Sequence, residues 1–426
     1  MNFQFSETFA RELDLEDPLS SMRNEFILPG PAGNNKIYFL GNSLGLQPHR
    51  TKGYIQTILD DWSALGVESF FHAREPWMDY HASLTRPLAT VMGCLPEEIS
   101  VMNQLTVNLH LLMVSFYRPS GKRVKIICES KAFPSDQYMF ETHLRSRGMV
   151  PEDILIELKP REGEATLQTA DILQQIRDTG NELALVLLGG INYYTGQVLD
   201  MEAITRAGHA VGARVGFDLA HAAGNIPLQL HAWNVDFAAW CSYKYLNAGP
   251  GAVGGVYIHE RFHQDTSIPR MAGWWGYEKE TRFQMEPGFK PIQSAEGWQL
   301  STPSLILYAA HRSSLSVIEQ AGWSNILAKQ KKLTAWLWFI LDHIRQDSAN
   351  ASQWEILTPV QQDQHGCQVS LYFPENGKKV FDHLTQKGVM ADWREPGVIR
   401  VAPVPLYNSF HEVWLFGSYL KEMLEI

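Results

Sequence analysis

The sequence predicts an α/β protein with a large domain built around a mostly parallel mixed sheet between helices, and a smaller C-terminal α/β domain. The middle of the chain alternates short apolar runs of strand length with segments of helical spacing, which is the order that produces such a sheet. A chain of 426 residues is also long enough to bury two hydrophobic cores. After about residue 300 the pattern changes, which indicates the second domain.

The predicted strands of the large domain are apolar and bounded by turn residues or helical patterns. They are "VKIICES" (124–130), "LALVLLGG" (183–190), "RVGFDLA" (214–220) and "FAAWCSY" (237–243). The segment "DMEAITRAGHAVGA" (200–213) lies between two of them, has helical spacing and begins with an aspartate. Ligands of open α/β sheets bind beyond the carboxyl ends of the strands, where Asp218 and Lys244 would both lie.

Three units follow from this pattern. Residues 1–45 form an arm or join the small domain, residues 46–300 form the large domain, and residues 301–426 form the small one. The segment "SLILYAAHRSSLSVIEQAG" is expected to be a long helix that leads out of the large domain. The segments "GCQVSLYF", "KKVFDHLTQKG" and "VIRVAPVP" then give a strand–helix–strand unit.

Composition excludes several classes of protein. The net charge is -10 without any Lys/Arg run, which argues against a nucleic-acid or anionic-membrane partner. The longest apolar runs are far shorter than the ~20 residues of a membrane helix, and the acidic amino terminus does not resemble a signal peptide. Four scattered cysteines without a C-x-x-C pair suggest neither disulfides nor a zinc site, so we expect no metal and a cytoplasmic location.

Lys244 lies in "CSYKYLNAGPG", directly after an apolar and aromatic run. One interpretation is a lysine whose stem packs at the strand end while its amine reaches solvent. The other is a desolvated amine that forms a Schiff base. If the strand continues to Lys244, its alternation places the flanking tyrosines on the opposite face, from which Tyr243 could reach a phosphate.

Pyridoxal phosphate needs an amine, an anionic partner for its pyridine nitrogen and donors for its phosphate. Asp218, at the end of "VGFD", could be the partner or simply a helix N-cap, and His221 could contact the ring or be a core histidine. Thr106 is predicted to cap a helix that begins near Leu105, an end suited to phosphate although most helix caps bind nothing. The stretch "FPSD" (133–136) lies at the crevice edge or forms an ordinary turn.

Several of these motifs together resemble the kynureninases, pyridoxal-phosphate-dependent hydrolases of the fold-type I aminotransferase superfamily. They are "GFDLAHAAGN", "WCSYKYLNAGPG", "GWWG" and "IRVAPVPLYNS", with "YFLGNSLGLQP" and "LTVNLHLL" nearer the amino terminus. The resemblance runs from about residue 37 to residue 411. It implies the fold-type I architecture and a homodimer whose active sites are shared between subunits.

The resemblance also implies residue roles. Lys244 would form the Schiff base, Asp218 would pair with the pyridine nitrogen, and His221 would contact the cofactor. Leu105, Thr106 and Tyr243 would hold the phosphate, and the cofactor ring would be lined by Phe133, Pro134, Ser135 and Asp136.

Two further groups of residues carry implied roles. Trp274 and Thr302 would reach the cofactor of the neighbouring subunit. Arg400 would bind the substrate's α-carboxylate through two N–H groups, and Ser43 and His72 would contact the substrate. Some kynureninases have asparagine at the position of Thr302, and serine at Gly189 or its neighbour, and either departure would alter phosphate contacts or ring selectivity.

The reaction implied is hydrolysis of L-kynurenine, or of its 3-hydroxy form, to an anthranilate and L-alanine, with Tyr243 as a candidate acid or base. The sequence leaves open whether this serves tryptophan breakdown or NAD biosynthesis. A cysteine desulfurase would carry a nucleophilic cysteine shortly before the carboxylate-binding arginine, and residues 389–400 contain none. A non-catalytic pyridoxal phosphate sensor would tolerate loss of Lys244 or Arg400, and both are present.

Overall fold

The computed structural model describes residues 3–31, 35–347 and 354–425. Its centre is a seven-stranded sheet with the order β2-β8-β7-β6-β5-β3-β4. The five strands from β7 to β4 run parallel, and β8 and β2 each pair antiparallel with their neighbour. The strands are β2 (Ile99–Val101), β3 (Lys125–Glu129), β4 (Leu155–Leu158), β5 (Leu183–Gly189), β6 (Arg214–Asp218), β7 (Phe237–Trp240) and β8 (Gly255–Ile258).

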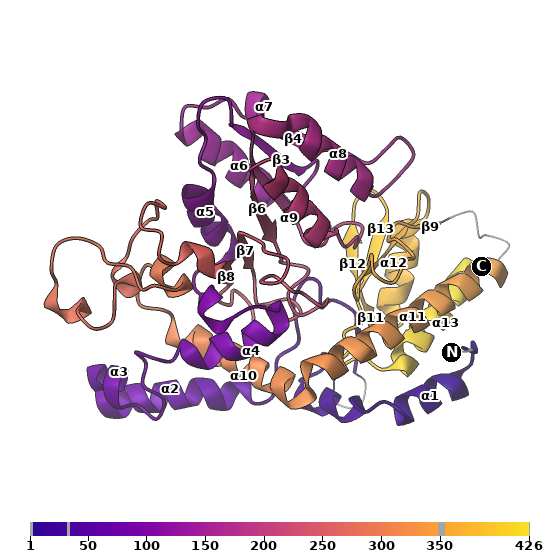
Figure 1. Ribbon diagram of the computed structural model, residues 1–426. Helices are drawn as coiled ribbons and strands as arrows, with labels where there is room; N and C mark the ends of the chain where they lie inside the picture. Colours follow the sequence, from indigo (N-terminus) through magenta and orange to yellow (C-terminus); the bar gives the residue numbers. More distant parts are fainter. Residues whose placement is uncertain (1–2, 32–34, 348–353, 426) are drawn as a thin grey trace.

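Helices cover both faces of this sheet (Figure 1). Side chains alternate along each strand, so Ile126 and Leu185 pack on one face while Ile127 and Val186 pack on the other. The first face is covered by α5 (Leu105–Phe116), α6 (Pro134–Ser146) and α7 (Pro151–Ile154). The second is covered by α4 (Ala82–Met92), α8 (Thr169–Thr179), α9 (Met201–Ala210) and α10 (Leu305–Ala321). The predicted α/β fold class is confirmed.

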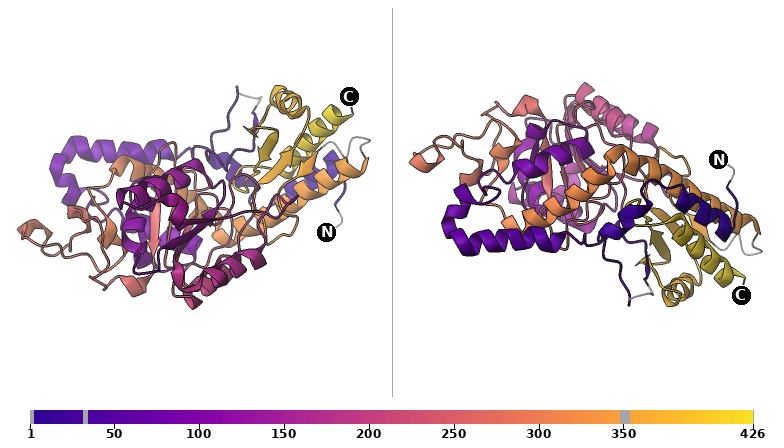
Figure 2. Two further views of the ribbon diagram at one scale, coloured as in Figure 1. Left: turned by 90° about the horizontal axis from the view of Figure 1, so that it is seen from above. Right: turned by 90° about the horizontal axis from the view of Figure 1, so that it is seen from below.

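A second core lies at the other end of the molecule, where Figure 2 shows both termini. It joins Ala10, Leu13, Ile37 and Phe39 to the C-terminal part of the chain. Its sheets are the antiparallel β12-β13-β10-β9 and the parallel pair β1-β11. The strands are β1 (Ile37–Tyr38), β9 (Glu355–Ile356), β10 (Val369–Tyr372), β11 (Val389–Met390), β12 (Asp392–Arg394) and β13 (Val398–Val401), and the helices are α1 (Glu7–Leu15), α11 (Trp323–Asp347), α12 (Gly377–Gln386) and α13 (Phe410–Leu424).

The change from one core to the other falls inside α11. The predicted long helix is α10, and its buried residues, among them Tyr308 and Leu315, pack into the core of the large sheet together with Ile326. Leu333 and the following buried residues of α11 pack into the second core. We therefore propose that the domain boundary expected near residue 300 lies between residues 326 and 333, and that α1 and β1 belong with the small domain, whereas Leu19, Met22 and Phe26 pack into the core of the large sheet.

The predicted strand 237–243 is shorter in the structure, because β7 ends at Trp240. The backbone then folds back on itself: Ala248 N–H donates to Ser242 O and Asn247 N–H donates to Lys244 O, both at 3.0 Å, with Asn247 at a φ of 56°. Strand alternation therefore does not orient the two tyrosines. Instead Tyr245 is buried, while Tyr243 and Lys244 are half-buried.

Two further helices, α2 (Thr51–Leu65) and α3 (Ser69–His72), extend along the large domain, and α2 packs against α10. The segment that joins β8 to α10 projects beside α3 (Figure 1). No helix among the described residues combines the length and the apolar character needed to cross a membrane.

His311, on α10, gives the fold a pH dependence that can be tested. Burial lowers the pKa of this histidine to about 3, against about 6.5 in an unfolded chain. Between these values the unfolded chain binds more protons, so stability falls as pH falls, by about 2 kcal/mol at pH 5 from this group. We expect His311→Gln to show a smaller loss of melting temperature between about pH 7 and pH 5 than the wild type, measured on the apoprotein. An equal loss in both proteins would contradict a neutral, buried His311.

Candidate active site

The carboxyl ends of the parallel strands enclose a cavity of about 260 Å³. It lies where β6 and β7 end and where α5 and α6 begin. Nine of the residues predicted to form the site line it: Leu105, Thr106, Phe133, Ser135, Asp136, Asp218, His221, Tyr243 and Lys244. Residues more than a hundred positions apart in the sequence therefore meet at the sheet edge that the parallel order predicts.

Lys244 directs its amine into this site and not into solvent. Its Nζ lies 2.8 Å from His221 Nε2 and 6.0 Å from the centre of the Phe133 ring. Gly45 N–H donates to Tyr243 O at 2.7 Å, and a β-carbon on Gly45 would come within 2.3 Å of Lys244 O, so the segment "GNSLG" packs tightly against the lysine loop. The interpretation of Lys244 as a solvent-exposed lysine at a strand end is wrong.

Three carboxyl groups line the cavity together with Lys244, and two of them, on Glu129 and Asp218, belong to buried residues. Burial raises the pKa of Glu129, Asp136 and Asp218, and the proximity of Asp218 raises the pKa of Asp136 further. Asp136 and Asp218 are close enough to influence each other, and the negative charge of Asp218 favours the protonated form of Asp136. Asp218 accepts Ala220 N–H at 2.7 Å, within a turn and not at a helix start, so the helix-cap interpretation of Asp218 is wrong.

His221 is buried, with an unpartnered Nδ1. Burial lowers its pKa first, and the nearby Lys244 lowers it further, so the ring is neutral at neutral pH. Burial also raises the pKa of Tyr243, which keeps its hydroxyl protonated. The site therefore combines an amine, a neutral imidazole, a phenol and buried carboxyl groups.

The beginnings of two helices close the cavity. The first residue of α5 is Leu105, and Gln104 has the extended backbone of an N-cap, so Thr106 is inside the helix and the prediction that it caps the helix is wrong. The N–H groups of the first α5 turn point out of the helix and are available to an anion. "FPSD" is the start of α6 with Pro134 at its first position, and not an ordinary turn.

The other predicted residues lie outside the cavity. Pro134 is on α6 behind it, and Ser43 lies in the segment that packs against the lysine loop. His72 is exposed at the end of α3, with Nε2 3.6 Å from Glu68. Trp274 is 42% exposed on the projecting segment, and Thr302 is exposed beside Gln104.

Arg400 is buried behind the cavity wall. Its Nε donates to Asp392 at 2.6 Å, its Nη2 forms an ion pair with the same carboxylate, and its Nη1 donates to Tyr193 O. Three of the five N–H groups of the guanidinium are engaged in this way, which leaves two, one on each terminal nitrogen, for a carboxylate.

Sequence reasoning missed two other side chains of the cavity wall. Tyr193 lies edge-on to Phe133, with ring centres 5.3 Å apart, and its carbonyl holds Arg400. Glu129 accepts Gly189 N–H at 2.8 Å and the Asn192 side chain at 3.0 Å. Glu129 ends β3, so the rule that identified Asp218 at the end of a parallel strand could have identified it too.

These residues fit pyridoxal phosphate. The unpartnered Nδ1 of His221 can form a hydrogen bond with the cofactor. The clustered carboxyl groups favour a cationic ring nitrogen beside them. The half-exposed Phe133 ring offers a face for stacking, and the start of α5 offers amides for a phosphate.

Comparison with known proteins identifies the family. The chain is 53% identical to kynureninase from Flavobacterium psychrophilum and 52% identical to that from Flavobacterium johnsoniae, over 99% of both chains in each case. It is 51% identical to kynureninase from Myxococcus xanthus, over 98% of this chain and 97% of the relative. This chain belongs to the kynureninase family. The family model of the kynureninase C-terminal domain matches residues 326–420, so the match begins within α11, the helix in which the two cores meet.

Solved structures share the fold of this kynureninase family member at low sequence identity. The apo cysteine desulfurase from Thermococcus onnurineus NA1 has a TM-score of 0.75 at 20% identity, covering 95% of this chain and 98% of that one. A C-DES mutant with glycine covalently linked to its PLP cofactor has a TM-score of 0.76 at 19% identity, covering 93% and 98%. Cys367, the cysteine nearest in sequence to Arg400, lies in the bend before β10 and is fully buried in the core, as expected for a packing residue.

Proposed function

We propose that this chain is a pyridoxal-phosphate-dependent hydrolase that cleaves the Cβ–Cγ bond of L-kynurenine or 3-hydroxy-L-kynurenine, releasing anthranilate or 3-hydroxyanthranilate and L-alanine. The observation that carries the proposal is the convergence of nine predicted residues on one cavity, in a chain that matches kynureninases over almost its full length. When bound, pyridoxal phosphate supplies a ring that accepts the electron pair left at the substrate's α-carbon.

Residues of the chain bind the cofactor and the substrate and carry the protons. Lys244 Nζ anchors the cofactor covalently and carries a proton to and from the substrate's α-carbon. Asp218 accepts a hydrogen bond from the protonated ring nitrogen. His221 and Phe133 hold the ring, and the start of α5 with Tyr243 holds the phosphate. The two N–H groups left on Arg400 bind the substrate's α-carboxylate, which fixes the orientation of the substrate.

Tyr243 suits a proton transfer at the substrate's γ-carbon. Its hydroxyl remains protonated, because burial raises its pKa, and so can donate a proton where negative charge develops. Tyr243 is half-buried and lines the cavity beside Lys244, whose Nζ lies 5.9 Å from the centre of the Tyr243 ring.

The assay that tests the proposal uses both substrates with the purified holoenzyme. Release of anthranilate or 3-hydroxyanthranilate, together with stoichiometric L-alanine, is the expected result. Alanine and a persulfide from L-cysteine, without turnover of either kynurenine, would instead indicate a desulfurase. Cofactor binding without turnover of any of these would indicate a sensor.

A homodimer with shared sites is the assembly we propose. Large apolar side chains are exposed on the projecting segment and on the neighbouring α3, with Phe283 lying 5.5 Å from Trp274 and 6.0 Å from Phe71 between ring centres. Such an apolar patch is stable when another protein surface covers it, and a second copy of the chain would provide that surface. Trp274 and Thr302 would then reach the neighbouring cofactor. The four free cysteines suit the reducing cytoplasm, where we place the enzyme.

Mixing two inactive variants tests the shared site. Lys244→Ala lacks the amine of its own site, and Trp274→Ala lacks the residue donated to its neighbour's site, so a mixed dimer holds one site with neither change. We expect activity to return after verified subunit exchange, to about a quarter of the wild-type rate if exchange is random and half of all dimers are mixed. The same mixing of Lys244→Ala with itself is the control. If Trp274→Ala alone is severely impaired and exchange restores nothing, the sites are not shared.

A further inference from the structure

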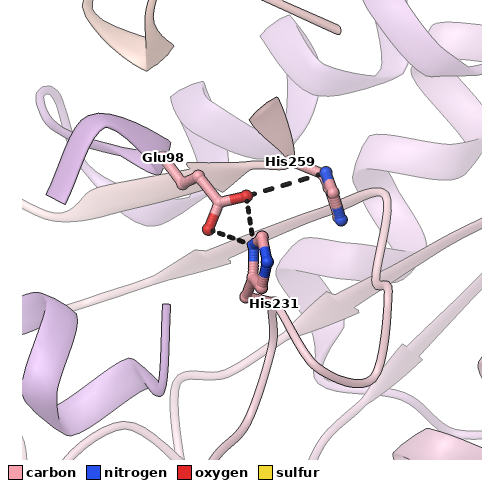
Figure 3. Close-up of side chains that lie close together, drawn as sticks. All are labelled: Glu98, His231 and His259. Atoms are coloured by element: carbon pink, nitrogen blue, oxygen red, sulfur yellow. Dashed lines mark hydrogen bonds and ion pairs between the residues drawn. The ribbon is translucent and has the colours of Figure 1, made fainter. Parts of the chain in front are cut away.

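Three side chains from separate segments meet at the edge of the large sheet opposite Lys244 (Figure 3). Glu98 ends a short helical turn, η3 (Pro96–Glu98), directly before β2, and His259 directly follows β8. His231 lies in the connection between β6 and β7. Because β8 runs antiparallel to β7, its end lies far from the carboxyl end of β7 that carries Lys244. The group is therefore separate from the cofactor cavity.

The donor atoms of this group have the spacing of metal ligands. His231 Nδ1 lies 3.0 Å and 3.1 Å from the two carboxylate oxygens of Glu98, and His259 Nδ1 lies 3.6 Å from Oε1. Zinc bonds of about 2.0–2.1 Å in tetrahedral geometry place ligand atoms about 3.3 Å apart, within this range. All three ligand atoms lie within 4.8 Å of one another.

Hydrogen bonds from the backbone fix the Glu98 carboxylate and one of the two imidazoles. Leu95 N–H donates to Glu98 Oε2 at 3.0 Å and Glu260 N–H donates to Oε1 at 2.9 Å, which fix the fully buried carboxylate. Arg261 N–H donates to His259 Nδ1 at 3.2 Å, so this nitrogen carries a lone pair. This nitrogen lies 3.6 Å from Glu98 Oε1, and a cation between the two atoms would be attracted by both.

We propose that Glu98, His231 and His259 bind a divalent transition-metal ion, with Zn²⁺ as the ion the ligand set suits. Two imidazole nitrogens and one carboxylate oxygen form a known zinc ligand set, and the backbone bonds to Glu98 orient the carboxylate. The His231 side chain is 37% exposed, which provides an entry path and room for a water as fourth ligand. On binding, the ion replaces the Arg261 hydrogen bond to His259.

The ion would act as a structural clip. It would join the turn before β2, the end of β8 and the connection before β7, which are neighbours at the antiparallel side of the sheet. The sequence gives no sign of this group, because its members are 133 and 28 residues apart (231 − 98 and 259 − 231) and no spacing rule for zinc ligands spans such distances.

Zinc binding by the holoenzyme tests the proposal. The protein is treated with a chelator, dialysed and titrated with Zn²⁺ by calorimetry, and its metal content is measured by atomic emission. We expect one Zn²⁺ per chain, and about a ten-fold or greater loss of affinity in both His231→Gln and His259→Gln. Zn²⁺ should raise the melting temperature of the wild type and not that of the variants. The control, His49→Gln, changes an exposed histidine outside the group and should bind Zn²⁺ as the wild type does.

Two results would overturn the proposal. One is the absence of stoichiometric Zn²⁺ binding by the wild type. The other is unchanged Zn²⁺ affinity in His231→Gln, which would mean that Zn²⁺ binds elsewhere on the chain. His231 is partly exposed, so its variant should fold even if His259→Gln does not, and circular dichroism and cofactor absorbance verify folding without relying on metal.

Discussion

Replacing Lys244 with alanine is expected to lower turnover of L-kynurenine by about three orders of magnitude or more, because the amine both anchors the cofactor and carries the proton of the α-carbon. The cofactor should still bind, since Asp218, His221 and the start of α5 are unchanged by the substitution. Two measurements are needed. Steady-state assays give the turnover, and mass spectrometry after borohydride reduction shows whether the cofactor is attached to the chain.

The matched control is Lys122→Ala, which removes an exposed lysine outside the cavity. It should keep both wild-type turnover and covalent attachment of the cofactor. Retention of even a tenth of wild-type activity by Lys244→Ala would show that another residue performs the chemistry, and so would a cofactor that remains covalently attached to that variant.

The fold could be predicted because its signals are local. Strands β3, β5 and β6 are apolar runs of strand length, and α9 is capped by Asp200, whose side chain accepts Ala203 N–H at 2.9 Å. The order of such elements along the chain is enough to indicate parallel pairing. The positions of Asp218 and Lys244 near strand ends followed from the same order, because carboxyl ends of parallel strands share one edge.

What the sequence did not reveal depends on contacts between distant segments. β7 ends at Trp240, and the chain then turns and packs on Gly45, about two hundred residues earlier. The local sequence pattern contains no sign of this contact, so it predicts a strand that continues through residues 241–243. The helical spacing of α10 gives no information about which core it enters. Tyr193 reaches the cavity from an irregular segment, and it is recognisable only through its contacts with Phe133 and Arg400.

The residues next to Lys244 in the sequence also do not determine the direction of its side chain. "SYKYLN" fits a lysine that reaches solvent as well as one that is turned inward, because both have the same local spacing. The contact with His221, 23 residues earlier, settles its direction in the folded chain. The same holds for Asp218, whose partner Asp136 belongs to a different helix start.

Asp218→Asn should slow turnover by about two orders of magnitude, roughly the effect of losing an electrostatic stabiliser. Asparagine has nearly the same shape and can still accept Ala220 N–H, so the turn after β6 should be preserved. What disappears is the negative charge that holds a proton on the cofactor's ring nitrogen, and a neutral ring withdraws electrons less well. The direct measurement is the exchange of the substrate's α-proton with deuterated solvent, which should slow in parallel with kcat.

Asp200→Asn serves as the matched control for Asp218→Asn. Asp200 caps α9 outside the cavity, and asparagine caps helices about as well as aspartate, so this variant should keep both rates. The comparison separates loss of a carboxylate in general from loss of this one. Unchanged kcat and unchanged exchange in a folded, cofactor-loaded Asp218→Asn protein would mean that Asp218 only closes the turn at Ala220, and that the ring nitrogen depends on a different group.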